Sequence, residues 1–219
     1  MIKAVLFDID GTLIDSNDAH AESFVEAFKK FGKTVSFIEL KWLIGMGADS
    51  ILEKFLSKNE IKKIGKDLLE YRKQIFLTDY LPQTKTFLNL KELFEKLHSD
   101  KILIELASSA GDEELEQYKK KLKISKYLSE ETTSDDAAEA KPAPDIFQAA
   151  LGKLENVKVE EALIIGDTPY DAEAAGKAKI KIIGVKTGGW SEEKLKSKGC
   201  FEVYENIGEI YKNYDNVFN

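Results

Sequence analysis

Predicted strands alternate with predicted helices after Pro82, and this alternation restricts the fold more than any other feature. The strands are short runs, several of them rich in β-branched residues, at "ILIELAS", "EETTS", "ALIIGD", "IKIIGV" and "FEVYE". Helix-forming stretches separate them at 84–98, 112–122, "PDIFQAAL" and "YDAEAAGKA". Strands that alternate with helices form βαβ units, so we predict an α/β fold, a parallel sheet with helices on both faces.

The amino-terminal part of the chain has a different texture. Residues 2–7, "IKAVLF", predict a buried first strand. No convincing strand follows from 17 to 79. Helical periodicity there predicts four helices, with turn signals at Gly32, "GMG" at 45–47 and "SKN" at 57–59. Their apolar positions are Phe24, Val25, Phe28 and Phe31; Leu40, Leu43 and Ile44; Ile51, Leu52 and Phe55; and Ile64, Leu68, Tyr71 and Ile75. We therefore expect a core of residues 1–15 and 82–219, interrupted by a helical domain of residues 16–81.

Charge and cysteine content exclude some classes of partner. The chain has 219 residues and a formal net charge of -7, which argues against a nucleic-acid-binding surface. Its densest basic run, "YKKKLK" at 118–123, is typical of the solvated face of a helix. The single cysteine, Cys200, suits a reducing compartment and is expected to pack as a small apolar residue. With no signal-peptide pattern and no apolar stretch near the ~18 residues of a membrane span, we expect a cytoplasmic protein without a membrane partner.

Polar residues follow three of the predicted strands. Asp8 and Asp10 follow the first, Ser108 the "ILIELA" strand and Asp167 the "ALIIG" strand. Ligands of an open parallel sheet bind beyond the carboxyl ends of its strands, so these groups should converge, and Lys141 in "KPAPD" should join them. Clustered carboxylates need a cation, and an all-oxygen ligand set favours Mg²⁺. A lysine beside Mg²⁺ implies a further anion, for which a phosphate fits.

The two strand-end aspartates can have different catalytic roles in phosphoryl transfer. Asp8 can act as nucleophile and form an aspartyl-phosphate. Asp10 can protonate the departing alcohol and later activate water. Gly11 allows the sharp turn after them. Lys141 would neutralise charge and Ser108 would hold a phosphoryl oxygen.

Four segments together resemble the motifs of the haloacid dehalogenase-like superfamily, in order. They are "DIDGTL", "AS" at 107–108, "KPAPD" and "GDTPYD". The resemblance covers nearly the whole chain and points to the phosphoglycolate phosphatase and β-phosphoglucomutase-like group. It implies a Rossmann-like core with a small helical cap inserted after the first motif. It also implies that the Asp8 side chain, the Asp10 carbonyl and Asp167 bind Mg²⁺, that Asp171 supports the metal through water, and that Ser108 and Lys141 bind the phosphoryl group.

Some residues of the predicted core have more than one possible role. Ser109 could replace Ser108, which could instead be a helix N-cap. Asp171 could serve only the dipole of the first helical turn. Lys179 stands where relatives often have a glycine that ends this helix.

The predicted cap also contains residues with two possible roles. His20 could lie near the crevice or on the surface. Gly45 and Gly47, in "GMGAD", could belong to a cap loop facing the active site or to a plain turn. Arg72, the only arginine, could bind a substrate carboxylate, although a solvated helix position is expected. Outside the cap, the loop "TGGW" at 187–190 is expected to pack through Trp190.

The predicted function is a Mg²⁺-dependent phosphatase that acts on a small phosphorylated metabolite. The alternative is a sugar-phosphate mutase resembling β-phosphoglucomutase. Such mutases carry an arginine just after the cap-loop glycine, and "GMGADS" has none, which favours the phosphatase. Dehalogenases of the family lack the second aspartate, so Asp10 counts against that activity. Retention of the motif residues gives no support to a non-catalytic binding module.

Overall fold

The computed structural model, described here for residues 1–218, divides the chain into two compact units. The core unit consists of Met1–Asp15 and Thr86–Asn219, and the helical unit is Ser16–Lys85. No helix within residues 1–218 is long and apolar enough to cross a membrane. That the helical unit serves as a cap stays a prediction.

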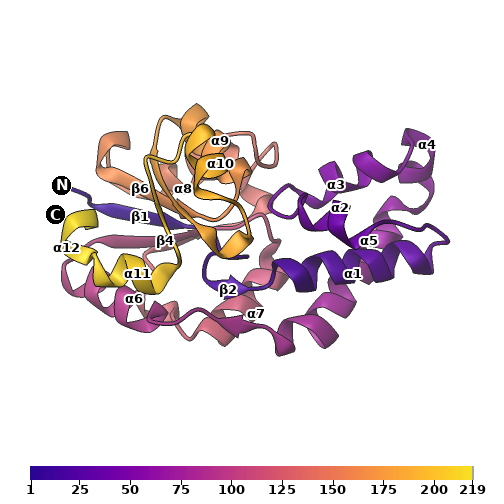
Figure 1. Ribbon diagram of the computed structural model, residues 1–219, viewed down its shortest axis with the longest axis horizontal. Coiled ribbons are helices and arrows are strands. Elements are labelled where there is room, and N and C mark those ends of the chain that lie inside the picture. The colour runs from indigo at the N-terminus through magenta and orange to yellow at the C-terminus, as the bar shows by residue number, and fades with distance from the viewer. Residues whose placement is uncertain (219) are drawn as a thin grey trace. The chain divides into compact units, whose positions relative to one another are not determined.

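A six-stranded sheet forms the centre of the core unit (Figure 1). Its strands are β1 (Ala4–Phe7), β4 (Leu103–Ala107), β5 (Glu130–Thr132), β6 (Ala162–Gly166), β7 (Lys181–Val185) and β8 (Glu202–Tyr204). The order is β5-β4-β1-β6-β7-β8 and all neighbouring pairs are parallel. This confirms the predicted α/β class and gives the strand order of a Rossmann-like sheet.

The reversal of strand order fixes where a ligand can bind. The chain runs outward from β1 to β4 and β5, then returns to place β6 on the other side of β1. Crevices in such sheets open beyond the carboxyl ends of the strands at this switch point. Asp8 directly follows β1 and Asp167 directly follows β6, so both lie at the edge where binding is expected.

Helices cover both faces of the sheet (Figure 1). One face carries α8 (Asp145–Lys153), α9 (Pro169–Ala178) and α10 (Glu192–Ser197). The other carries α6 (Leu90–Ser99), α11 (Ile207–Lys212) and α12 (Tyr214–Phe218). Alternate residues of β1 pack against the two helical layers. Ala4 and Leu6 belong to the apolar cluster that includes residues of α8 and α9, and the ring of Phe7 lies 4.8 Å from that of Phe94 on α6. Cys200 is buried in the first cluster and Trp190 packs against it, as predicted.

The helical unit packs its helices around its own apolar cluster. Its elements are α1 (Asn17–Lys30), α2 (Phe37–Lys41), α3 (Ala48–Phe55), α4 (Lys58–Glu60) and α5 (Lys66–Ile75). The π-helical segment Ile61–Gly65 joins α4 to α5, and a second one, Phe76–Tyr80, extends α5 at its carboxyl end. The predicted turn at 57–59 is wrong after its first residue, because Ser57 caps α4 in a reciprocal pair with Glu60.

The remaining differences from the predicted elements involve short segments. The helix predicted over 84–98 begins only at Leu90, because Lys85–Thr86 is strand β3, which pairs with β2 (Ile14–Asp15), and Asn89 is left-handed with φ of 60°. Helix α7 (Asp112–Leu122) has the predicted bounds. Helices α10, α11 and α12 were not predicted. Each is too short to give a clear helical period in the sequence.

Candidate active site

Asp8 and Asp167 meet at the switch point of the sheet. The Asp8 residue is 7% exposed and Asp167 is fully buried. The hydroxyl of Thr12 lies 3.3 Å from Oδ2 of Asp8 and 3.2 Å from Oδ1 of Asp167, within donating distance of both. Thr12 therefore ties the ends of β1 and β6 together. Its position in "DIDGTL" is the signal that could have identified it.

Lys141 is the cation of this cluster. It is 1% exposed, and its Nζ lies 2.6 Å from Oδ1 of Asp8 and 2.7 Å from Oδ1 of Asp171. Burial alone lowers the pKa of Lys141, but the carboxylates of Asp171 and Asp8 more than offset this and hold it above its ordinary value. The ammonium therefore stays charged at neutral pH.

Asp171 has a second duty as the third residue of α9. Its Oδ2 accepts hydrogen bonds from the backbone N–H of Thr168 (3.0 Å) and from the Thr168 hydroxyl (2.6 Å), while Thr168 accepts from the Asp171 N–H. This reciprocal cap fixes the carboxylate in place. Asp171 thus lies in the first helical turn, but it does not serve the helix alone, because the same side chain also pairs with Lys141.

The protonation of Asp8 depends on what surrounds it. Burial raises the pKa of Asp8 to about 7, Lys141 opposes this, and the carboxylates of Asp171 and Asp10 add to the rise. Without a further cation the cluster therefore holds more negative charge than one lysine neutralises.

The donor set suits a hard divalent cation. Carboxylate oxygens of Asp8, Asp167 and Asp171 lie within 4.8 Å of one another, and all three residues are buried. Oxygen-only ligands favour Mg²⁺ over Zn²⁺. Two positive charges would also offset the repulsion among these carboxylates, which adds to the rise in the pKa of Asp8 that burial causes. These residues therefore fit a Mg²⁺ ion.

Two glycines make room for these carboxylates. A Cβ at Gly188 would lie 2.1 Å from Oδ2 of Asp167, and one at Gly166 would lie 2.8 Å from Cβ of Asp171. The hydroxyl of Thr187 donates to the carbonyl of Gly11. The segment "TGGW", predicted only to be a packing loop, therefore lies directly against the acidic cluster.

Asp10 is held by a residue that the sequence did not identify. The hydroxyl of Tyr118 lies 2.8 Å from Oδ1 and 3.0 Å from Oδ2 of Asp10. Tyr118 is fully buried and Leu122 is 7% exposed, so the prediction that "YKKKLK" forms a solvated face is wrong for its first and fifth residues. The buried residues of α7 lie at 114, 115, 118 and 122, a helical spacing that could have indicated the inward face.

Ser108 directly follows β4 and is 1% exposed. Its Oγ accepts a hydrogen bond from the N–H of Ala110 at 3.1 Å. The N-cap of α7 is Gly111, so the interpretation of Ser108 as that cap is wrong. Ser109 is only partly buried.

Arg72 and His20 are both buried in the helical unit, each 6% exposed. The predicted solvated position of Arg72 is therefore wrong, as is a surface position for His20. The Arg72 guanidinium donates to Nδ1 of His20 and, at 3.3 Å, to the hydroxyl of Ser23. Since arginine only donates, Nδ1 of His20 is the acceptor in this contact. The His20 ring stacks on Phe76, with 3.9 Å between ring centroids.

The remaining singled-out residues have backbone roles. Gly45 has φ of 100°, which glycine adopts most easily, and Gly47 precedes α3 as its N-cap. Lys179 ends α9 with φ of 63°, a left-handed conformation that glycine adopts without strain. A substrate-binding role for Gly45 and Gly47 stays a prediction.

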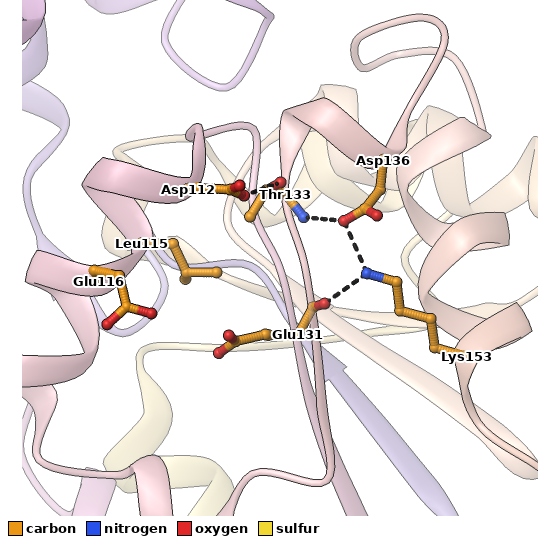
Figure 2. Close-up of a pocket in the computed structure, with 7 residues that line it drawn as sticks. All are labelled: Asp112, Leu115, Glu116, Glu131, Thr133, Asp136 and Lys153. Carbon is orange, nitrogen blue, oxygen red and sulfur yellow. Dashed lines mark hydrogen bonds and ion pairs between the residues drawn. The ribbon is translucent and has the colours of Figure 1, made fainter.

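A separate pocket of about 350 Å³ lies beside α7 and β5 (Figure 2). None of the predicted site residues lines it. Several polar groups that line the pocket bind one another. Nζ of Lys153 lies 2.8 Å from both the Glu131 carbonyl and the Asp136 carboxylate, and the Thr133 hydroxyl donates to Asp112 at 2.8 Å. The acidic cluster at the sheet edge, and not this pocket, carries the chemistry that the sequence predicts.

Comparison with known proteins identifies the family of this chain. The family model described as "Haloacid dehalogenase-like hydrolase" matches residues 5–185. The chain belongs to the haloacid dehalogenase-like hydrolase family. This confirms the resemblance drawn from its motifs, and the phosphatases among its named relatives identify this hydrolase as a phosphatase.

Relatives of this haloacid dehalogenase-like hydrolase carry several names. "Putative pyrophosphatase PpaX" of Clostridium perfringens is 32% identical, over 89% of both chains. "Phosphoglycolate phosphatase" of Aquifex aeolicus is 29% identical, over 82% of this chain and 83% of that protein. The chain is also 32% identical to "Protein SUPPRESSOR OF QUENCHING 1, chloroplastic" of Arabidopsis thaliana, but spans only 20% of its length. A solved structure named "Putative beta-phosphoglucomutase", from Bacteroides vulgatus, matches with TM-score 0.84 and 25% identity, over 98% of this chain and 88% of the other.

Proposed function

We propose that this phosphatase is Mg²⁺-dependent and hydrolyses a small phosphomonoester through an aspartyl-phosphate on Asp8. One observation carries the proposal. The Asp8 carboxylate lies at the sheet switch point, 2.6 Å from the ammonium of Lys141, within a buried group of three aspartates whose oxygens lie within 4.8 Å of one another. A nucleophile, a fixed cation and a set of hard ligands thus occupy one place.

In the first step Asp8 and Asp10 act on opposite sides of the phosphorus. A carboxylate oxygen of Asp8 forms a bond to phosphorus while the bond from phosphorus to the alcohol oxygen breaks. The electron pair of that bond stays on the leaving oxygen, which takes the proton of the Asp10 carboxyl group. The alcohol departs and Asp10 is left ionised.

The second step reverses the role of Asp10. Its carboxylate takes a proton from water as the water oxygen bonds to phosphorus, and the bond between phosphorus and Asp8 breaks. Inorganic phosphate leaves, Asp8 is again a carboxylate and Asp10 again carries a proton. The same side chain serves as acid and then as base, so the cycle returns to its starting protonation.

Fixed charges stabilise both steps. Lys141 faces Asp8 and offsets its repulsion of the phosphoryl oxygens, and the hydroxyl of Ser108 donates to one of them, with Ser109 as the alternative donor. Mg²⁺, held by Asp8, Asp167 and the Asp10 carbonyl with support from Asp171, would supply further charge neutralisation at the phosphoryl group.

The substrate class follows from the relatives and not from a single residue. Two of the relatives, a putative pyrophosphatase and a phosphoglycolate phosphatase, are named for small phosphorylated substrates. Phosphoglycolate and small sugar phosphates therefore form the panel of first choice, and inorganic pyrophosphate, an anhydride and not an ester, is added because one relative is named for it. The helical unit, with His20, Gly45 and Gly47, is proposed to act as the cap that encloses them.

A sugar-phosphate mutase is the second candidate, because the similar Bacteroides vulgatus structure carries that name. The segment "GMGADS" lacks the arginine expected after the cap-loop glycine, which favours hydrolysis. The two activities differ in a simple assay. A mutase interconverts sugar phosphates and needs a bisphosphate, whereas the proposed phosphatase releases phosphate without one.

The test is phosphate release across the panel, with Mg²⁺ and with EDTA, by the native protein and by Asp8→Asn. Turnover should require Mg²⁺, and Asp8→Asn should abolish it because an amide is a poor nucleophile. Asp135→Asn makes the same chemical change at an exposed position of the core unit and should keep full activity. Near-native phosphate release by Asp8→Asn, or full activity in metal-free buffer, would contradict the proposal.

A further inference from the structure

We infer that Tyr118 is a positioning residue for Asp10, an inference that rests on the proposed function because Asp10 is its acid and base. Tyr118 does not touch the reacting atoms. It acts by holding the carboxyl group of Asp10 in the orientation that both proton transfers need. None of the four sequence motifs contains Tyr118, which lies in α7, the helix that follows the "AS" motif.

The contact between Tyr118 and Asp10 is a hydrogen bond and not only side-chain packing. The hydroxyl lies almost midway between the two oxygens of Asp10, at 2.8 and 3.0 Å, so one donor holds the end of this side chain in place. Tyr118 is fully buried, whereas Asp10 is only partly buried. A rigid donor from the interior therefore restrains an acid that faces a more open space.

Helix α7 gives this contact its precision. Tyr118 shares the inward face of α7 with Leu115 and Leu122, which lie one turn before and after it and are also buried. Tyr118 thus lies in the middle of the buried face of α7. The same helix starts at Asp112, just after the loop that carries Ser108, so α7 connects the proposed phosphate-binding loop to the proposed acid.

The contact is compatible with both forms of Asp10 in the cycle. When Asp10 is a carboxylate, either oxygen can accept the tyrosine hydrogen. When Asp10 is protonated, the hydroxyl of Tyr118 donates to the oxygen without the proton, and the acid O–H remains directed at the leaving oxygen. Tyr118 gains and loses no proton, so the balance of each step is unchanged.

Tyr118→Phe removes the hydroxyl and keeps the ring, and two substrates of similar size separate its effects. p-Nitrobenzyl phosphate releases an alcohol, which needs a proton from Asp10. p-Nitrophenyl phosphate releases a far better leaving group, which does not. For the benzyl ester we expect kcat/KM to fall about 10- to 100-fold, the scale of one lost hydrogen bond to a charged group. For the phenyl ester kcat/KM should stay within about threefold of the native value.

The phenyl ester gives a second readout. Hydrolysis of the aspartyl-phosphate still needs Asp10 as base, so kcat should fall while kcat/KM is kept, and KM should fall with it. Rapid-quench measurements should then show more phosphorylated protein in the steady state. A general loosening of the fold would lower kcat/KM for both esters and would not produce this split.

Tyr127→Phe is the matched control. Tyr127 is also buried in the core unit, 6% exposed, and its hydroxyl donates to Glu95 at 2.7 Å, a carboxylate outside the proposed site. It should leave the kinetics of both esters unchanged. In the Asp10→Asn background, Tyr118→Phe should cause no further loss, because the acid that it positions is absent.

Three outcomes overturn the inference, and they differ from failure of the proposed function. Native-like kinetics of Tyr118→Phe with both esters, an equal loss with both, or an undiminished loss in the Asp10→Asn background would each show that Tyr118 does not position Asp10. All three are measured with an active native protein whose Asp8→Asn variant is inactive, so the proposed function stands. If the native protein hydrolyses no phosphomonoester, the proposed function fails and the role of Tyr118 fails with it.

Discussion

Glu105 is a buried acid in the middle of strand β4, and replacing it with glutamine should make the protein more stable at alkaline pH. The residue lies on β4 and is fully buried. Its Oε1 accepts a hydrogen bond of 2.5 Å from the hydroxyl of Thr132, while Oε2 has no hydrogen-bond partner within residues 1–218. An ionised carboxylate in this position is poorly compensated.

Burial raises the pKa of Glu105 from 4.5 to about 8, although Thr132 and Lys153 oppose the rise. The folded protein therefore binds this proton more tightly than the unfolded chain does. Its contribution to stability is fully present below pH 4.5 and is lost progressively up to about pH 8. A shift of this size corresponds to at most about 5 kcal/mol, since one pKa unit is about 1.4 kcal/mol.

The assay is the free energy of unfolding from urea titrations at pH 5 and pH 9, in EDTA so that metal binding does not contribute. Glu105→Gln should change the free energy of unfolding by less than about 1 kcal/mol at pH 5, because both side chains are uncharged in the folded protein and can accept from Thr132, and pH 5 is only slightly above the ordinary pKa of 4.5. At pH 9 it should be more stable than the native protein by about 2 to 5 kcal/mol. Comparing variant with native protein at each pH cancels other titrating groups, including Asp8.

Glu130→Gln is the matched control, because Glu130 is the register partner of Glu105 on β5 but is exposed. It should change the free energy of unfolding by less than about 0.5 kcal/mol at either pH. The reasoning is refuted if Glu105→Gln has the same effect at pH 5 and pH 9, since Glu105 would then carry the same charge in the folded and unfolded protein.

Three further substitutions test the site and its supports. Lys141→Ala should lower kcat/KM by about two to three orders of magnitude through loss of a preorganised cation, and a native kcat/KM would place Lys141 outside the site. In urea titrations with EDTA the variant should be less stable by about 3 kcal/mol, because Asp8 and Asp171 lose their shared partner. Gly188→Ala should raise the Kd for Mg²⁺ about 10-fold or more in calorimetric titration, because the added Cβ displaces Asp167. Gly152→Ala is the control, because nothing lies within 4 Å of its Cβ, and equal Kd values for the two variants would disprove the steric argument. Lys179→Gly should raise the free energy of unfolding by about 1 kcal/mol in urea titrations, because glycine adopts the left-handed φ of 63° without strain, and a loss of stability would contradict this.

Residues that take their position from a strand end could be predicted from the sequence. Asp8 and Asp167 follow runs whose β-branched and apolar composition predicts buried parallel strands, and parallel strands bring their carboxyl ends to one edge. Lys141 was predicted to join them because "KPAPD" precedes a helix of the same sheet. These inferences need only the type and direction of each element, which local sequence encodes.

The contacts of Tyr118 and Arg72 could not be predicted in this way. Both lie among charged residues, so composition favoured solvent, yet each is buried and hydrogen-bonded. The partner of Tyr118 is 108 positions away, and that of Arg72 through His20 is 52 away. A helical period indicates which residues share a face, but not what that face packs against.

The sequence by itself therefore determined the class of fold, the edge of the sheet that carries the site, and the chemical groups at that edge. Only the tertiary structure decided how those groups are held: Thr12 between Asp8 and Asp167, Gly188 against Asp167, and Tyr118 on Asp10. The physical reason is range. Strand and helix formation depend on neighbours in the chain, whereas the orientation of a carboxyl group depends on side chains that only folding brings within hydrogen-bond distance.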